Sequence, residues 1–119
     1  MTSTIVVVDD NPLITQLLSE ALSDEGYAVH VLGDGRSALA AITAQPPDLV
    51  LLDLQLPLMS GEEVLIHIRQ QHGADLPIVI MTASIQRQAW VPQGATAFLA
   101  KPFDLNKLLT CVAQYVAPE

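Results

Sequence analysis

Aromatic and basic residues are scarce in this chain of 119 residues. Only 4% of the residues are Phe, Trp or Tyr, too few to predict a platform on which nucleic-acid bases could stack. Five Lys and Arg residues stand against 13 Asp and Glu residues, which gives a formal net charge of −8. Because contacts with nucleic-acid phosphates need clustered cations, this balance argues against direct nucleic-acid binding.

Cysteine is rare, and long hydrophobic runs are absent from the sequence. The single cysteine, Cys111, permits no internal disulfide and is typical of a reducing cytoplasm. No apolar run approaches the roughly 20 residues that a membrane span needs. No basic segment or cleavage-site pattern precedes Ile5, where the first apolar run begins. We therefore predict a cytoplasmic protein with no signal peptide and no membrane partner.

Aliphatic residues, in contrast, are abundant. Half of the residues are hydrophobic, so residues 1–119 are long and apolar enough to form one globular domain. Short apolar runs, typical of strands buried on both faces, alternate with segments of helical periodicity. We predict strands at Ile5–Val8, Tyr27–Leu32, Asp48–Asp53, Pro77–Met81 and Thr96–Ala100. Strands separated by helices in this way indicate an α/β fold, with a parallel sheet and helices on both faces.

Capping residues mark where several helices begin and end. Asn11 can cap the first helix, with Pro12 at its first position and Gly26 at its end. Asp34 and Asp104 can cap the second and the last helices in the same way.

Five polar residues stand at the ends of the apolar runs. They are Asp9 and Asp10 after the first run, Asp53 at the end of the third, Thr82 after the fourth and Lys101 after the fifth. Ligands of open parallel sheets bind beyond the carboxyl ends of the strands, so residues far apart in sequence can meet there. Three carboxylates, a hydroxyl and an ammonium group in one place predict a site for metal-assisted phosphoryl chemistry.

Carboxylates this close together favour a divalent cation. Two unit charges about 4 Å apart repel by about 1 kcal/mol in water and by about 4 kcal/mol at an effective dielectric constant near 20. Mg²⁺ often binds one or two carboxylates together with a phosphate and keeps several of its waters. A divalent cation such as Mg²⁺ would therefore relieve the charge of this acidic cluster.

A series of short motifs runs along nearly the whole chain. They are Val8-Asp9-Asp10-Asn11, Gly33-Asp34-Gly35, Pro47-Asp48-Leu49-Val50-Leu51-Leu52-Asp53-Leu54, Pro57-Leu58-Met59-Ser60-Gly61, Met81-Thr82-Ala83, Gly94-Ala95 and Lys101-Pro102-Phe103. In this order the motifs resemble the receiver domain of two-component response regulators, the family of the chemotaxis regulator. The resemblance implies a flavodoxin-like, doubly wound sheet of five parallel strands in the order 2-1-3-4-5, with the switch point between strands one and three.

The same resemblance implies a role for each acidic residue. Asp53 would accept the phosphoryl group as an acyl phosphate. Asp10 and Asp53 would bind Mg²⁺ directly, whereas Asp9 would act mostly through water. The backbone carbonyl of Gln55 would complete the protein ligands of the metal.

The resemblance also implies which residues hold the phosphoryl group and respond to it. The Thr82 hydroxyl, the Ala83 backbone N–H and the Lys101 ammonium group would bind it. Thr82 and Phe98 would form the conformational switch. A cis peptide bond between Lys101 and Pro102 would aim the lysine inward.

The implied function is signal transduction rather than enzymatic turnover. A sensor histidine kinase or a histidine phosphotransfer protein would donate the phosphoryl group, and the domain would promote only its own phosphorylation and dephosphorylation. The phosphorylated domain would then control a downstream protein or a linked output domain. We expect no output domain within residues 1–119, and a homodimer is a further implied state.

Three other interpretations use the same residues. A Mg²⁺-dependent phosphatase would usually carry a second acid two residues after the nucleophile, where this chain has Gln55. A flavin-binding module would need a phosphate-cradling loop after the first strand, where Asp9-Asp10-Asn11-Pro12 is anionic. A degenerate receiver would serve only as a docking surface, against which the full set of site residues argues.

The sequence departs from the family between Thr82 and Lys101. This stretch is shorter than usual by about one helical turn. Pro92 and Gly94 leave only Ser84–Val91 for the fourth helix, which is therefore predicted to be shortened. Phe98 stands where the family often has tyrosine, so the expected switch lacks a hydroxyl group.

Overall fold

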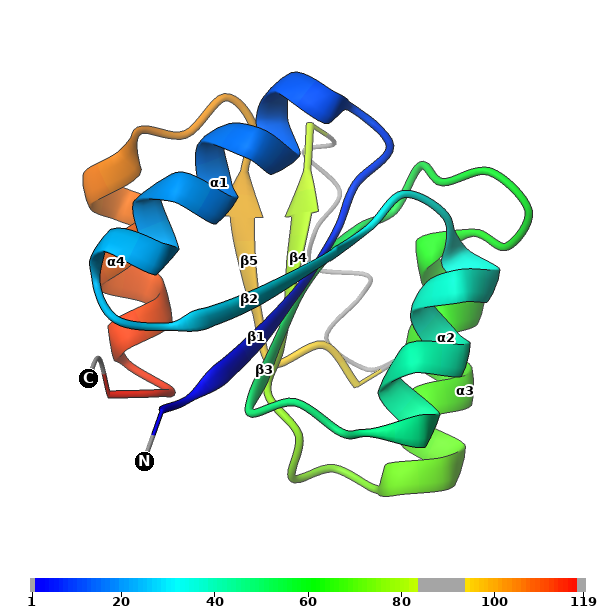
Figure 1. Ribbon diagram of the computed structural model, residues 1–119. Coiled ribbons are helices and arrows are strands. Elements are labelled where there is room, and N and C mark those ends of the chain that lie inside the picture. The colour runs from blue at the N-terminus through cyan, green and yellow to red at the C-terminus, as the bar shows by residue number, and fades with distance from the viewer. Residues whose placement is uncertain (1, 84–93, 118–119) are drawn as a thin grey trace.

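The computed structural model describes residues 2–83 and 94–117 (Figure 1). In chain order its elements are β1 (Thr4–Val8), α1 (Pro12–Asp24), β2 (Ala28–Leu32), α2 (Gly35–Ala44), β3 (Leu49–Asp53), α3 (Gly61–His72), β4 (Ile78–Thr82), β5 (Ala97–Ala100) and α4 (Leu105–Ala113). The predicted helix at Ser84–Val91 lies outside the described residues, so α4 corresponds to the last helix predicted from the sequence.

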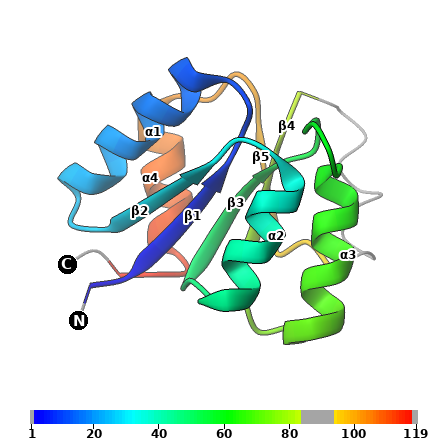
Figure 2. The same ribbon diagram turned by 45° about the vertical axis from the view of Figure 1, so that its right-hand side comes forward.

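The strands form one parallel sheet in the order β2-β1-β3-β4-β5. This order confirms the predicted flavodoxin-like, doubly wound fold. Helices α1 and α4 cover one face of the sheet, and α2 and α3 cover the other (Figures 1 and 2). The chain reverses direction across the sheet between β1 and β3, so the carboxyl ends of these two neighbouring strands border the switch point.

Two aliphatic cores lie on the two faces of the sheet. Ile5 and Val7 of β1 pack with α1 and α4, whereas Val6 and Val8 pack with α2 and α3. This alternation follows from the two-residue period of a strand. All four side chains are buried, so β1 is fixed between the layers and holds the residues that follow it in place.

The edge strand β5 differs from the prediction that the apolar runs are buried on both faces. The central strands β3 and β4 are buried throughout, but β5 has half-buried residues at Ala97 and Phe98 and an exposed residue at Ala100. β2 is likewise only partly buried. Among the strands in residues 2–83 and 94–117, each of these pairs with one neighbour only, so its outer side lacks the cover that a second strand would provide.

Four of the predicted strands begin one residue later than expected, at Ala28, Leu49, Ile78 and Ala97. The predicted capping residues Asn11, Asp34 and Asp104 do precede α1, α2 and α4, and each accepts a hydrogen bond from a backbone N–H of the first turn. Within the described ranges, none of the helices has the length and apolar character needed to traverse a lipid bilayer.

Candidate functional site

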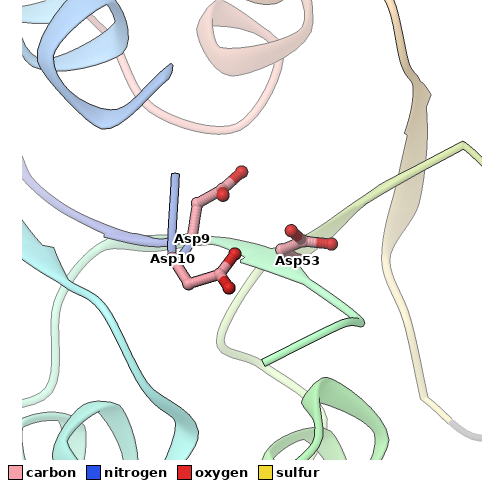
Figure 3. Close-up of side chains that lie close together, drawn as sticks. All are labelled: Asp9, Asp10 and Asp53. Atoms are coloured by element: carbon pink, nitrogen blue, oxygen red, sulfur yellow. The ribbon is translucent and has the colours of Figure 1, made fainter. Parts of the chain in front are cut away.

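Three acidic side chains converge where β1 and β3 end. Asp9 and Asp10 follow β1 directly, and Asp53 is the last residue of β3 (Figure 3). One carboxylate oxygen of each residue lies within 4.8 Å of the others. Asp9 and Asp53 are buried, with 2% and 8% of their surface exposed, whereas Asp10 is exposed. The sequence-based prediction that these acids meet is therefore confirmed.

Lys101 bridges the two buried carboxylates. Its ammonium nitrogen Nζ lies 2.8 Å from Asp9 Oδ2 and 3.1 Å from Asp53 Oδ2. The residue follows β5, and its backbone N–H donates a hydrogen bond of 2.8 Å to the carbonyl of Thr82 at the end of β4. The Lys101–Pro102 peptide bond is cis, the isomer that the resemblance implied. The carboxyl ends of β1, β3, β4 and β5 thus all contribute to one site.

Burial and charge act in opposite directions on the ionisable groups of this site. Burial raises the pKa of Asp53, and the hydrogen bonds from Lys101 and from the Gln55 backbone N–H only partly offset that effect. Burial alone lowers the pKa of Lys101, but its hydrogen bonds to Asp9 and Asp53 outweigh burial, so this pKa is raised. Lys101 is therefore held as a cation, and its charge counteracts the effect of burial on the pKa of Asp53.

Short turns orient the two buried carboxylates. The Asn11 backbone N–H donates to Asp9 Oδ1 at 2.9 Å, and the Gln55 backbone N–H donates to Asp53 Oδ1 at 3.2 Å. In each case the donor lies two residues after the aspartate, which is the spacing of an Asx turn. The second oxygen, Oδ2, of each aspartate contacts Lys101. Both carboxylates are therefore fixed before any ligand arrives.

The remaining predicted residues lie around this site or lead away from it. Thr82 is buried at the end of β4, in register with Ala100 of β5, and Ala83 after it is exposed. Phe98 is half-buried and packs against the core under α2 and α3. Thr82 pairs with Ala100 of β5, and Phe98 lies two residues before Ala100 on that strand. The β4–β5 pair thus connects Thr82 at the site to Phe98.

Oxygen atoms of this kind and spacing suit a hard divalent cation. Mg²⁺ takes carboxylate and carbonyl oxygens and usually keeps several waters. The exposed Asp10 leaves one side of the cluster open to solvent, as such a hydrated ion requires. The residues present therefore fit the predicted metal.

Sequence analysis missed two features of the site. It paired Lys101 with an incoming phosphoryl group, but not with Asp9, because no local pattern links positions 92 residues apart. It placed Gly61 in a motif without a reason for the glycine. The structure supplies one, because a Cβ at Gly61 would lie 2.2 Å from the carbonyl oxygen of Asp53 and 2.6 Å from Leu54 Cα.

We expect Gly61→Ala to lower the free energy of unfolding by about 1–3 kcal/mol, the range for overpacking a well-packed interior. The clash involves backbone atoms, which cannot rotate away, so α3 must move relative to β3. Gly33→Ala is the matched control, because a Cβ at Gly33 would meet nothing within 4 Å. Chemical denaturation should find the control within about 0.5 kcal/mol of the unmodified protein. Equal stability of the two variants would contradict this account of Gly61.

Comparison with known proteins agrees with this geometry. The family model described as response regulator receiver domain matches residues 5–113. The chain belongs to the family of response regulator receiver domains. It is therefore a receiver domain of the two-component type, and the phosphatase and flavin-module interpretations are not supported.

Curated relatives include transcriptional regulators. The probable transcriptional regulatory protein TcrX of Mycobacterium tuberculosis is 38% identical over 109 residues, which cover 89% of this chain and 46% of that protein. The DNA-binding response regulator MtrA of Mycolicibacterium smegmatis is 39% identical over 115 residues, covering 94% of this chain and 50% of that protein. This chain thus spans about half the length of the curated relatives that it matches.

Two similar solved structures cover the receiver fold almost completely. The chemotaxis response regulator CheY4 of Vibrio cholerae has a TM-score of 0.91 and 32% identity, over 98% of this chain and 100% of that chain. The receiver domain of the sensor histidine kinase PA1611 of Pseudomonas aeruginosa has a TM-score of 0.87 and 28% identity, over 97% and 98% of the two chains. That second structure holds a magnesium ion coordinated in its active-site cleft.

Proposed function

We propose that Asp53 of this receiver domain accepts a phosphoryl group from a phosphorylated histidine of a kinase or phosphotransfer protein. The observation that carries the proposal is the position of the Asp53 carboxylate at the end of β3, beside Asp9 and Asp10 and in contact with Lys101. In the reaction one Asp53 oxygen forms a bond to phosphorus. The bond between phosphorus and the donor imidazole breaks, and the imidazole keeps the electron pair.

Asp10, Asp53 and the backbone carbonyl of Gln55 would hold Mg²⁺ directly, and Asp9 would contact it mostly through water. When bound, the ion supplies positive charge that offsets the charge of the incoming phosphoryl group. The chain's own contribution is orientation. The Gln55 backbone N–H is hydrogen-bonded to Asp53 Oδ1. Oδ2 contacts Lys101, so Oδ2 is the oxygen that would bond to phosphorus in place of that contact.

Lys101, Thr82 and Ala83 would then hold the transferred group. Lys101 Nζ already lies 3.1 Å from Asp53 Oδ2, so it can pair with a phosphoryl oxygen attached there. The Thr82 hydroxyl and the Ala83 backbone N–H would donate further hydrogen bonds. Movement of Thr82 toward the phosphoryl group would free space for Phe98, which is a two-state change of packing biased by charge.

Incubation with Mg²⁺ and a small acyl-phosphate donor tests the proposal. The unmodified protein should gain the mass of one phosphoryl group, and Asp53→Asn should gain none. Asp48→Asn is the matched control, because Asp48 precedes the same strand at its opposite end and should not affect labelling. Labelling of Asp53→Asn to the level of the unmodified protein would contradict the assignment of Asp53 as the phosphoacceptor.

We propose further that the protein acts as a phosphoacceptor switch rather than as a turnover enzyme, and that residues 1–119 belong to a single receiver domain. Control of a downstream protein or of a linked output domain, and dimerisation, would follow phosphorylation.

Exposed leucines beside the site mark where the histidine donor would dock. Leu13, Leu17 and Leu58 are 78%, 51% and 71% exposed, and α1 begins two residues after Asp10. A donor protein must cover this rim to bring its phosphohistidine to Asp53. We expect Leu13→Ser with Leu17→Ser to slow phosphorylation by a phosphorylated donor protein about tenfold, which is about 1.4 kcal/mol. The rate with a small acyl phosphate should not change, and equal slowing with both donors would reject this docking face.

A further inference from the structure

The Arg69 side chain, in the last turn of α3, binds four oxygen atoms at the end of the sheet opposite the acidic site. Nε donates to Gly94 O at 2.8 Å, Nη1 donates to Gly73 O at 3.1 Å and Leu76 O at 2.7 Å, and Nη2 donates to Thr96 Oγ1 at 3.2 Å. The planar guanidinium group with five donor hydrogens suits such a set of acceptors, and lysine cannot reproduce it.

These acceptors belong to two connections of the chain. Gly73 and Leu76 lie between α3 and β4, whereas Gly94 and Thr96 lead into β5. Thr96 is joined to the first residue of β4 as well, because Ile78 N donates to Thr96 Oγ1 at 3.0 Å and Thr96 N donates to Ile78 O at 2.9 Å. Arg69 therefore ties the end of α3 to the beginnings of both β4 and β5.

The glycine at position 94 leaves room for the Arg69 side chain. Gly94 has a positive φ of 103°, and a Cβ there would lie 2.9 Å from Arg69 Cγ and 3.1 Å from Nε. Burial lowers the pKa of the Arg69 guanidinium, and the charge of Asp75 partly offsets this effect. An arginine remains protonated throughout the accessible pH range, so the side chain acts as a fixed cation.

The other ends of α3 and β5 both lie at the acidic site. The first residue of α3, Gly61, donates its backbone N–H to Leu54 O at 3.0 Å and lies against the carbonyl of Asp53. At 12 residues, α3 extends about 18 Å from that point to its other end. β5 ends at Ala100, next to Lys101, whose backbone donates to Thr82 O. Asp53 and Lys101 are thus linked through α3, Arg69 and β5 as well as through their direct contact.

We propose that Arg69 is a positioning residue that holds β5, and through it the Lys101 ammonium group, in place relative to Asp53. This inference rests on the proposed function of Asp53 as the phosphoacceptor. A displacement of about 1 Å, even from a substitution far from the reacting atoms, can slow a reaction about a hundredfold. Loss of the Arg69 hydrogen bonds therefore weakens the placement of Lys101 without removing any group from the site.

Amide hydrogen exchange tests the mechanical link without any phosphorylation. Arg69→Met and Arg69→Lys should each raise the exchange rate of the Lys101 backbone N–H. The fold increase at Lys101 should be about ten times the fold increase at the Val7 N–H in the central strand β1. Lys107→Met, which removes an exposed cation from α4, is the control for the change in net charge and should leave both rates unchanged. An equal rise at Lys101 and Val7 in the Arg69 variants would mean a general loss of stability and would overturn the inference.

Phosphorylation rates with a small acyl phosphate test the functional link at a temperature where every variant is folded. Arg69→Met should slow the reaction about ten- to a hundredfold. In a Lys101→Met background the same substitution should have almost no further effect, because Arg69 acts through Lys101. The same fold reduction in both backgrounds, or an unchanged rate in Arg69→Met, would overturn the inference. Failure of the unmodified protein to react would instead refute the phosphoacceptor assignment, while the exchange result still decides the link between Arg69 and Lys101.

Discussion

Replacing Lys101 with methionine should lower the free energy of unfolding by about 3 kcal/mol in metal-free buffer at neutral pH. This is the lower end of the range for removing one partner of a buried ion pair, because the lysine side chain is itself 20% exposed. The lysine Nζ lies within 3.1 Å of two carboxylates whose side chains are only 1% and 11% exposed. Its removal leaves Asp9 and Asp53 facing each other without a cation. Chemical denaturation in the presence of a chelator measures the loss.

Two controls separate this effect from a general effect of losing a cation. Lys107→Met changes the net charge by the same amount, but Lys107 is an exposed residue of α4. Its loss should therefore change the free energy of unfolding by no more than about 0.5 kcal/mol. Asp9→Asn in the Lys101→Met background should recover part of the stability, because it removes one of the two uncompensated buried charges. Equal stability of Lys101→Met and Lys107→Met would show that the buried pair contributes nothing.

The pH dependence of the same comparison has a definite sign. Hydrogen bonds to Asp9 and Asp53 raise the pKa of Lys101 above its ordinary value of 10.5, despite the opposing effect of burial. A cation with a raised pKa stabilises the fold fully below its ordinary pKa, and this contribution disappears as the pH rises through the raised value. The stability difference between the unmodified protein and Lys101→Met should therefore persist up to about pH 10.5 and shrink above it.

The parallel sheet was predictable because several local signals agree, whereas the order of its strands was implied by the resemblance to receiver domains. The apolar runs, the caps Asn11, Asp34 and Asp104, and the alternation of strands with helices all indicate the same parallel sheet. Asp9 and Asp53 were expected to meet because both stand at carboxyl ends of parallel strands, and the strand order implied by the resemblance makes those two strands neighbours.

Contacts that depend on side-chain reach across the fold were not predictable in the same way. The bridge from Lys101 to Asp9 requires the exact placement of β5 relative to β1, which no local pattern specifies. Arg69 gives an even clearer case. Its position near the end of α3 is explained locally by the helix dipole, which favours a cation there. Nothing in the surrounding residues indicates that its guanidinium group reaches Gly94, 25 residues further along the chain.

Burial at the sheet edges was mispredicted for a related reason. An apolar run such as Phe98-Leu99-Ala100 has the same composition whether its strand is central or at an edge. Of the strands that the structure describes, only β4 pairs with β5, and Ala100 is exposed. Sequence periodicity reports the faces of a strand, whereas the number of neighbouring strands is a property of the whole sheet.

Mg²⁺ should raise the stability of the domain through the acidic site, and Asp10→Ala should remove most of that increase. By linkage, a ligand at about 100 times its dissociation constant adds about 2.7 kcal/mol to the free energy of unfolding. Asp10 is the exposed member of the three carboxylates, so its removal deletes a proposed metal ligand without leaving a buried charge unpaired. Melting temperatures measured with Mg²⁺ and with a chelator give the metal response of each variant.

The metal-free behaviour of the same variant distinguishes a metal ligand from a structural residue. Asp10→Ala should be slightly more stable than the unmodified protein in chelator, because it removes the repulsion between Asp10 and the neighbouring carboxylates. Asp24→Ala is the matched control, since that exposed aspartate ends α1 about 20 Å from the helix start beside the site. The control should keep the full response to Mg²⁺. A full response in Asp10→Ala, or a loss of the same size in both variants, would show that Mg²⁺ stabilises the domain somewhere other than at Asp10.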